Sequence, residues 1–241
     1  ELAHSIKEAF YIASTGRPGP VLMDLPKDVM QARTEFEYPK TISLRSYNPN
    51  YTPNRKQVKK AASLLAKAER PLIYSGGGVI SSEAGEILTR LARRFSLPVT
   101  STMMGLGAFP GNDSLWLGML GMHGTYAANM AVNNADVLLS VGARFDDRVT
   151  GKVNTFAPRA KIIHIDIDPT SIRKNVNVHI PIVSDCLNAL KTLDEEMGEI
   201  NEVQWEEKHS AWVKTVKGWS QEQPLKYETG ISGKIKPQYV M

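Results

Sequence analysis

The chain has 241 residues, of which 42% are hydrophobic and 22% charged, a composition typical of a folded domain and unlike that of disordered, collagenous or coiled-coil proteins. Its formal net charge of +4 is dispersed along the chain, which favours a small anionic ligand over nucleic acid. The single cysteine, Cys186, excludes an intrachain disulfide, and no apolar run approaches the ~18 residues of a membrane span. We expect a cytoplasmic protein with no membrane partner.

The N-terminal part predicts the end of one domain followed by a linker. Apolar residues recur at helical spacing over Ala3–Ser14, and a Gly- and Pro-rich stretch ends that helix. A strand is expected at Val21–Leu25. The polar stretch 35–53 is typical of a linker. Because the sequence starts at Glu1 within a helical pattern, we expect a piece excised from a longer protein, with residues 1–34 closing a truncated domain.

From Asn54 onward, helical and strand patterns alternate, which predicts βαβ units. The fold class is therefore α/β, a doubly wound, mostly parallel sheet with helices on both faces, over residues 54–197. Pro181 suits an edge strand, because proline cannot donate to the sheet ladder. Strands are expected at Leu72–Ser75, around Val99, and at Val137–Val141, Ile162–Ile165 and Ile180–Val183. Helical faces are expected at Val58, Ala61, Ala62 and Leu65; at Ile87, Leu88, Leu91, Ala92 and Phe95; and at Leu187, Leu190 and Leu193.

The C-terminal residues 198–241 predict one more helix, with Trp205, Trp212, Val213 and Val216 on one face, and then a tail from Gln221 without clear periodicity. We expect this part to hold the start of another truncated domain.

Three segments carry candidate ligand groups at predicted strand ends. Gly76–Gly78 follow a strand, where glycine lets backbone amides approach a phosphate or simply forms a tight turn. Asp166 and Asp168 suit ribose hydroxyls or turn formation, and they follow the glycines at a much longer distance than in the usual NAD fingerprint. Residues 142–149 place two arginines and two aspartates after a buried strand, which suits a bound anion or a solvated loop.

Other motifs have plainer interpretations. Met122 and His123 lie in a glycine-flanked turn, where the methionine could form an apolar wall and the histidine lacks the spacing of a metal ligand. Gly111-Asn112-Asp113 imitates the thiamine diphosphate motif in the wrong order, so we interpret it as a decoy. Cys186 is expected to be a buried packing residue. The sequence predicts no metal site.

Six segments taken together resemble the large catalytic subunits of the acetohydroxyacid synthase (acetolactate synthase) family. They are GRPGPVLMDLPKDV at Gly16–Val29, YSGGG at Tyr74–Gly78, STMMGLGAFPG at Ser101–Gly111, LGMHGTYAANMAV at Leu120–Val132, GARFDDRVTGK at Gly142–Lys152 and HIDIDP at His164–Pro169.

The resemblance implies that residues 54–197 form the central FAD-binding domain of a thiamine diphosphate enzyme, in which the flavin takes no net part in the redox chemistry. It implies a flavin site lined by Arg17, Gly76, Gly77, Gly78, Thr102, Met103, Leu120, Gly121, Met122, His123, Gly142, Arg144, Asp146, Arg148, Val149, Asp166, Ile167, Asp168 and Asp185. It also implies that Arg148 holds the carboxylate of the second 2-oxo acid, and that Lys27 lies on the access channel to the catalytic site.

For the whole enzyme, the resemblance implies condensation of two pyruvates, or of pyruvate with 2-oxobutanoate, with loss of carbon dioxide, in branched-chain amino-acid biosynthesis. Thiamine diphosphate and magnesium would serve that reaction, but their motifs are not in these residues, so we expect the piece alone to be inactive. Implied partners are further catalytic subunits, in a dimer or tetramer, and a regulatory small subunit. The alternatives are the central domain of glyoxylate carboligase or pyruvate oxidase, or a non-catalytic nucleotide-binding module.

Overall fold

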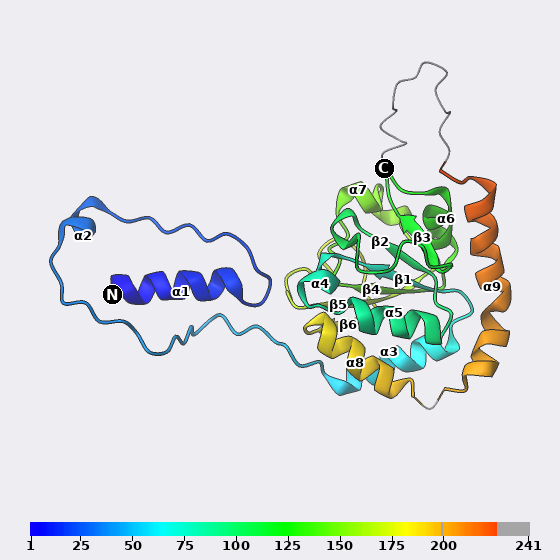
Figure 1. The fold of residues 1–241 in the computed structure, drawn as a ribbon, viewed down its shortest axis with the longest axis horizontal. Helices are drawn as coiled ribbons and strands as arrows, with labels where there is room; N and C mark the ends of the chain where they lie inside the picture. The colour runs from blue at the N-terminus through cyan, green and yellow to red at the C-terminus, as the bar shows by residue number, and fades with distance from the viewer. Residues whose placement is uncertain (199, 226–241) are drawn as a thin grey trace, which may run out of the picture.

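A six-stranded, fully parallel sheet forms the centre of the protein in a computed structural model that describes residues 1–198 and 200–225 (Figure 1). The strands are β1 (Pro71–Ser75), β2 (Val99–Ser101), β3 (Trp116–Met119), β4 (Val137–Val141), β5 (Lys161–Asp166) and β6 (Ile180–Val183). Their order in the sheet is β3-β2-β1-β4-β5-β6. This is the strand order of dinucleotide-binding Rossmann folds, in which the winding direction reverses between β1 and β4. The predicted α/β class is confirmed.

Helices cover both faces of the sheet (Figure 1). They are α3 (Arg55–Lys67), α4 (Gly77–Ser81), α5 (Gly85–Arg94), α6 (Tyr126–Asn134), α7 (Asp147–Thr150), α8 (Cys186–Glu196) and α9 (Glu202–Glu222), with short 3-10 turns η1 (Met103–Gly105) and η2 (Val153–Thr155). One buried cluster joins α3, α5 and α8 to the sheet, and the other joins α6 and the second half of α9 to the opposite face. Side chains alternate along β1, so that Ile73 enters the first cluster and Leu72 and Tyr74 the second.

Local signals explain where several elements begin. The Asn54 side chain accepts hydrogen bonds from the backbone amides of Lys56 and Gln57, which caps the N-terminus of α3. The predicted apolar face of α3 is fully buried. β6, with Pro181, lies at the edge of the sheet, as expected. The indole N–H groups of Trp205 and Trp212 on α9 donate to the carbonyl oxygens of Phe95 and Pro71, which fixes this long helix against the end of α5 and the start of β1.

The N-terminal segment, residues 1–53, lies to one side of this α/β unit (Figure 1). It contains α1 (Leu2–Ser14), which was predicted, and α2 (Lys27–Gln31), which was not. The predicted strand at Val21–Leu25 is wrong: no neighbouring strand pairs with it in the described residues, and without a ladder the segment stays irregular. Leu22 is 93% exposed. Residues 32–54 contain no helix or strand.

Four elements of the α/β unit were not predicted: β3, α4, α6 and α7. Gly118 interrupts the apolar pattern of β3, and α4 and α7 are too short for a helical period to be visible. Most of the C-terminal tail, from residue 226, lies outside the described residues. No helix in the described part of the chain is long and apolar enough to cross a bilayer.

Candidate functional site

The candidate site begins where the sheet reverses direction, at the carboxyl ends of β1 and β4. A ligand crevice forms at this position in open α/β sheets because the two following loops leave in opposite directions. The structure has a cavity of about 550 Å³ there, within the usual range for small-molecule sites. Its lining includes residues from the ends of five strands, β1, β2, β4, β5 and β6, and from the N-terminal segment: Ser14, Gly16, Arg17, Pro18, Tyr51, Gly77, Gly78, Ser81, Ser82, Thr102, Met104, Gly142, Ala143, Arg144, Asp146, Asp166, Ile167, Asp185 and Cys186. We call it the switch-point cavity.

Two glycine loops form the floor of this cavity by packing against each other. The Gly78 amide donates to the Gly142 carbonyl oxygen at 3.1 Å, and the Gly76 amide donates to Val141 at 2.8 Å. A Cβ added at Gly78 would lie 2.7 Å from the Gly142 Cα, closer than a side chain can approach. The glycines therefore allow close loop-to-loop contact, and the amides of Gly76 and Gly78 are already used within the protein. Gly77 and Gly78 line the cavity.

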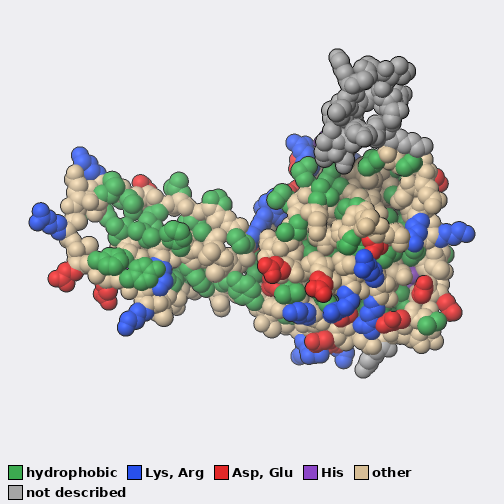
Figure 2. All heavy atoms as spheres, viewed as in Figure 1, with side chains coloured by type: hydrophobic (Ala, Val, Ile, Leu, Met, Phe, Trp, Pro, Cys, Tyr) green, Lys and Arg blue, Asp and Glu red, His purple; other side chains and the backbone are tan. Residues whose placement is uncertain are grey.

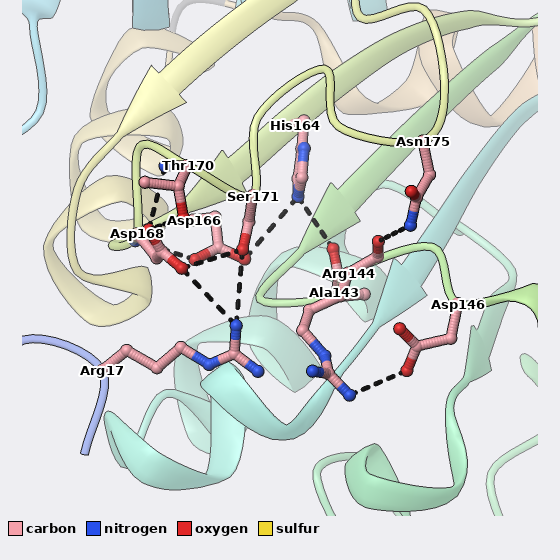
Figure 3. A network of polar contacts seen from close by, with 10 residues as sticks. All are labelled: Arg17, Ala143, Arg144, Asp146, His164, Asp166, Asp168, Thr170, Ser171 and Asn175. Atoms are coloured by element: carbon pink, nitrogen blue, oxygen red, sulfur yellow. Dashed lines mark hydrogen bonds and ion pairs between the residues drawn. The ribbon is translucent and has the colours of Figure 1, made fainter. Parts of the chain in front are cut away.

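Charged groups of both signs surround the opening. Arg144 pairs with Asp146 at 2.9 Å, and both side chains are about half exposed. Arg17, from the N-terminal segment, reaches Asp168 at 3.5 Å and the Ser171 hydroxyl at 3.4 Å (Figure 3). Guanidinium groups suit phosphate or carboxylate ligands.

The two aspartates after β5 have different surroundings. Asp166 is 6% exposed and lines the cavity, and its Oδ1 accepts the Asp168 amide at 2.9 Å. Asp168 does not line the cavity but organises its own turn, accepting from the Thr170 amide and hydroxyl and from the Ser171 hydroxyl. Burial alone would raise the pKa of Asp168, but these hydrogen bonds and the Arg17 charge outweigh it and lower the pKa. The turn-forming interpretation therefore describes Asp168 in this structure.

A second, smaller cavity of about 350 Å³ lies between the β3–α6 loop and α7. We call it the Arg148 cavity; its lining is Leu120, Gly121, Met122, Asn129, Val132, Asn133, Asp147, Arg148, Val149, Thr150, Gly151, Thr155 and Phe156. The Met122 amide donates to the Arg148 carbonyl oxygen at 2.9 Å, which ties the two loops together. The Arg148 side chain is 72% exposed and lies 3.8 Å from Asp147. This end of the 142–149 segment is a solvated surface here.

The predicted site residues thus separate into groups. Ten of them line the switch-point cavity and five the Arg148 cavity. Gly76 belongs to the floor loops and Asp168 to the turn after β5, but neither lines the cavity, and Met103 and His123 are exposed. Lys27 begins α2, which Figure 1 shows at the outer end of the N-terminal segment, so the structure does not bring it to Arg148.

Several residues in or beside the cavity were not predicted as site residues. Tyr51 and Ser82 line the switch-point cavity, and His164 and Asn175 bind the turn that carries Arg144. A histidine inside an otherwise apolar strand was the available signal for His164, since a buried polar side chain needs a partner.

Cys186 is buried, as expected, and Asp113 makes contacts within the protein. Burial, together with the charges of Asp166 and Asp185, raises the pKa of Cys186 to about 12, so the thiol stays protonated and unreactive near neutral pH. Asp113 pairs with Arg93 at 2.8 Å and accepts the Leu115 amide, which is a structural role. No cluster of metal-ligating side chains exists in the described residues.

Comparison with known proteins gives a consistent result. The sequence model of the family "Thiamine pyrophosphate enzyme, central domain" matches residues 58–193. The acetolactate synthase large subunit of Haemophilus influenzae is 46% identical over 245 residues, covering 100% of this chain and 42% of that protein. The isozyme 3 large subunit of Escherichia coli is 44% identical over 100% of this chain and 42% of its own length. The large subunit of Buchnera aphidicola is 46% identical over 98% of this chain and 41% of its own length. The chain spans about two fifths of the length of these curated relatives.

Proposed function

We propose that this chain, which belongs to the family of thiamine pyrophosphate enzyme central domains, is the FAD-binding middle part of an acetolactate synthase large subunit. The observation that carries the proposal is 44–46% identity to such subunits along the whole chain. We further propose that residues 1–34 end the preceding domain, that 35–53 link it to a central domain at 54–197, and that 198–241 lead into the next.

The switch-point cavity is the proposed flavin site. Its chemistry fits a dinucleotide, because Arg17 and Arg144 offer cationic donors for a diphosphate while Asp166 and Asp185 offer acceptors for ribose hydroxyls. Side chains of the protein do not fill this crevice, so a ligand has space to enter. The other predicted residues, in and around the Arg148 cavity, would contact the remainder of the flavin.

In the proposed whole enzyme, pyruvate loses carbon dioxide and its two-carbon unit joins a second pyruvate or a 2-oxobutanoate. Thiamine diphosphate, held with magnesium, supplies the electron sink for the decarboxylation. Arg148 binds the carboxylate of the second 2-oxo acid and so orients its carbonyl group. Met122 shapes the apolar wall beside it, and Lys27 is proposed to approach this channel in the assembled enzyme. FAD takes no net part in the electron balance.

We propose that the enzyme works in the cytoplasm as a dimer or tetramer of catalytic subunits with a small regulatory subunit. On this proposal the chain by itself binds FAD but forms no acetolactate.

The flavin site is tested by titrating the purified chain into FAD and following flavin fluorescence. We expect quenching or a spectral shift, and a loss of affinity of about tenfold or more in Arg144→Ala, because a charge-assisted contact is removed. Arg159→Ala is the matched control, since Arg159 is an exposed arginine whose guanidinium contacts Asn134, away from the cavity. Unchanged FAD fluorescence at high protein concentration would contradict the proposed site.

The activity is tested on the continuous gene product by measuring acetolactate from pyruvate. Arg148→Ala should alter the preference between pyruvate and 2-oxobutanoate more than it alters the first decarboxylation. Tartronate semialdehyde formed from glyoxylate would favour a glyoxylate carboligase, and oxygen consumption with pyruvate a pyruvate oxidase. A reading frame that encodes no further thiamine diphosphate domain would favour a non-catalytic module.

A further inference from the structure

The turn that carries Arg144 has an unfavourable backbone conformation that needs support from the surrounding structure. Gly142 has φ +62° and Phe145 has φ +57°. Glycine adopts this left-handed region freely, but a bulky residue such as phenylalanine rarely does. A conformation of this kind persists only where the surrounding structure fixes it. Groups outside residues 142–146 must therefore hold this turn.

Two side chains from the β5 region bind the carbonyl oxygens of this turn (Figure 3). The His164 Nε2 lies 2.8 Å from the Ala143 carbonyl oxygen. The Asn175 Nδ2 donates to the Phe145 carbonyl oxygen at 2.9 Å and reaches that of Arg144 at 3.4 Å. Three consecutive carbonyl groups are thus oriented by two side chains.

Aromatic packing fixes the same turn from inside. The Phe145 ring is 2% exposed and packs against Tyr74 and His164, with centroid separations of 5.5 and 5.0 Å. His164 itself is fully buried. The histidine therefore contacts both the backbone of the turn and its one large apolar side chain.

The hydrogen bonding determines which nitrogen of His164 carries a proton. A carbonyl oxygen can only accept, so Nε2 must be protonated. The buried Nδ1 has no partner in the described residues, and a proton there would be a buried donor without an acceptor. Asp166 does not serve as an acceptor for Nδ1, because its Oδ2 lies on the Nε2 side of the ring, 3.7 Å from Nε2, and its Oδ1 accepts the Asp168 amide. The neutral Nε2–H tautomer satisfies the site best.

We propose that His164, as this neutral tautomer, and Asn175 are positioning residues that hold Arg144 at the rim of the switch-point cavity. Neither residue lines the cavity, so both act through the turn. The role in ligand binding rests on the proposed flavin site, whereas the tautomer and the rigidity of the turn are properties of the chain alone.

The tautomer is measured on the whole 241-residue chain with ¹⁵N-labelled histidine, using long-range ¹H–¹⁵N correlation spectra assigned through His164→Gln. We expect a neutral Nε2–H pattern for His164 near neutral pH. An Nδ1–H pattern or an imidazolium pattern at that pH would overturn the proposal.

The positioning role is tested with two variants that differ in one donor. The side-chain amide introduced by His164→Gln can reach the place of Nε2 and donate, whereas His164→Leu fills similar space without a donor. We expect His164→Leu to weaken FAD binding about tenfold, the effect of one lost hydrogen bond, and His164→Gln to stay within about threefold of wild type. Asn175→Ala should resemble His164→Leu. Equal affinities for the Leu and Gln variants would show that only packing matters.

Two further measurements keep the result interpretable. Val58→Ala, on the buried face of α3, lowers stability in the cluster on the other side of the sheet from Phe145 and should leave the FAD affinity of the folded chain unchanged. Backbone ¹⁵N order parameters of residues 142–146 should fall in His164→Leu and be restored in His164→Gln. If wild type binds no FAD, the proposed function fails; the order parameters and the tautomer then still decide whether His164 holds the turn.

Discussion

The α/β unit and the N-terminal segment differ in how far they bury their apolar side chains. The α/β unit buries two clusters, one on each face of the sheet. In the segment, α1 has no buried residue, and Phe10, Leu22 and Phe36 are 72%, 93% and 80% exposed. Figure 2 shows hydrophobic side chains gathered over this segment. Apolar patterning alone therefore does not make a core; the matching surface must also be present.

The largest expected difference comes from deleting apolar side chains in the two parts. Leu139 in β4 is fully buried, so Leu139→Ala should lower the free energy of unfolding by about 2–5 kcal/mol. Phe10→Ala removes a larger but exposed side chain and should change it by no more than about 0.5 kcal/mol. Urea unfolding followed by far-UV circular dichroism measures both. A comparable loss for Phe10→Ala would mean that the segment contributes a core of its own.

Alanine substitutions at two glycines, one in each part, compare how closely the backbone is packed. Gly78→Ala places a methyl group 2.7 Å from the Gly142 Cα and should cost about 1–3 kcal/mol or more, because two backbones must separate. Gly19→Ala, in the segment, has nothing within 4 Å of the new Cβ and should stay within about 0.5 kcal/mol of wild type. Thermal unfolding of the two variants provides the check. Equal melting temperatures would show that the cavity floor is not closely packed.

The two parts of the chain also differ in how much of their structure the sequence predicted. Buried strands and the apolar faces of α3, α5 and α8 were predicted, because their periodicity reflects burial within the chain itself. The strand at Val21–Leu25 was predicted wrongly, since periodicity does not reveal whether a pairing strand exists. Gly78 was marked as a site residue, but its contact with Gly142 depends on the order of strands in the sheet. The partners of His164 and Asn175 are backbone carbonyl groups, which the sequence does not identify, so even the unusual histidine in an apolar strand did not reveal its contact.

Removing residues 1–48 tests directly whether the α/β unit is stable without the N-terminal segment. Among the described residues, the polar contacts that cross from this part to the α/β unit are those of Arg17 with Asp168 and Ser171, and partly exposed contacts of this kind contribute little. We expect the shortened chain to unfold with a free energy within about 1 kcal/mol of the full chain in urea, while FAD binding weakens because Arg17 is lost. A much larger loss of stability would show that the segment supports the sheet.

The smallest effect concerns the ion pair at the same boundary. Because the folded protein lowers the pKa of Asp168, its contribution to stability is present above the unfolded value of about 3.9 and is lost as the pH falls below it. Asp168→Asn should remove this part of the acid dependence, by less than about 1 kcal/mol since the pair is partly exposed.

An NMR titration of the Asp168 carboxyl group in Arg17→Ala gives the independent measurement. We expect the pKa to move upward, toward the ordinary value for aspartate, because one stabilising charge is gone. An unchanged pKa would assign the whole effect to Thr170 and Ser171.

The close contact between Gly78 and Gly142 also constrains how a molecule could come and go. Two backbones that are in contact without intervening side chains cannot be separated by rotamer changes. The floor of the switch-point cavity therefore does not open through side-chain fluctuations. Exchange with solvent must therefore pass the open side of the cavity, whose lining includes Met104, which is 75% exposed, and Arg17 from the N-terminal segment. The residence time of a bound ligand would then depend on how these two side chains move, while the glycine floor determines only which ligand shapes fit.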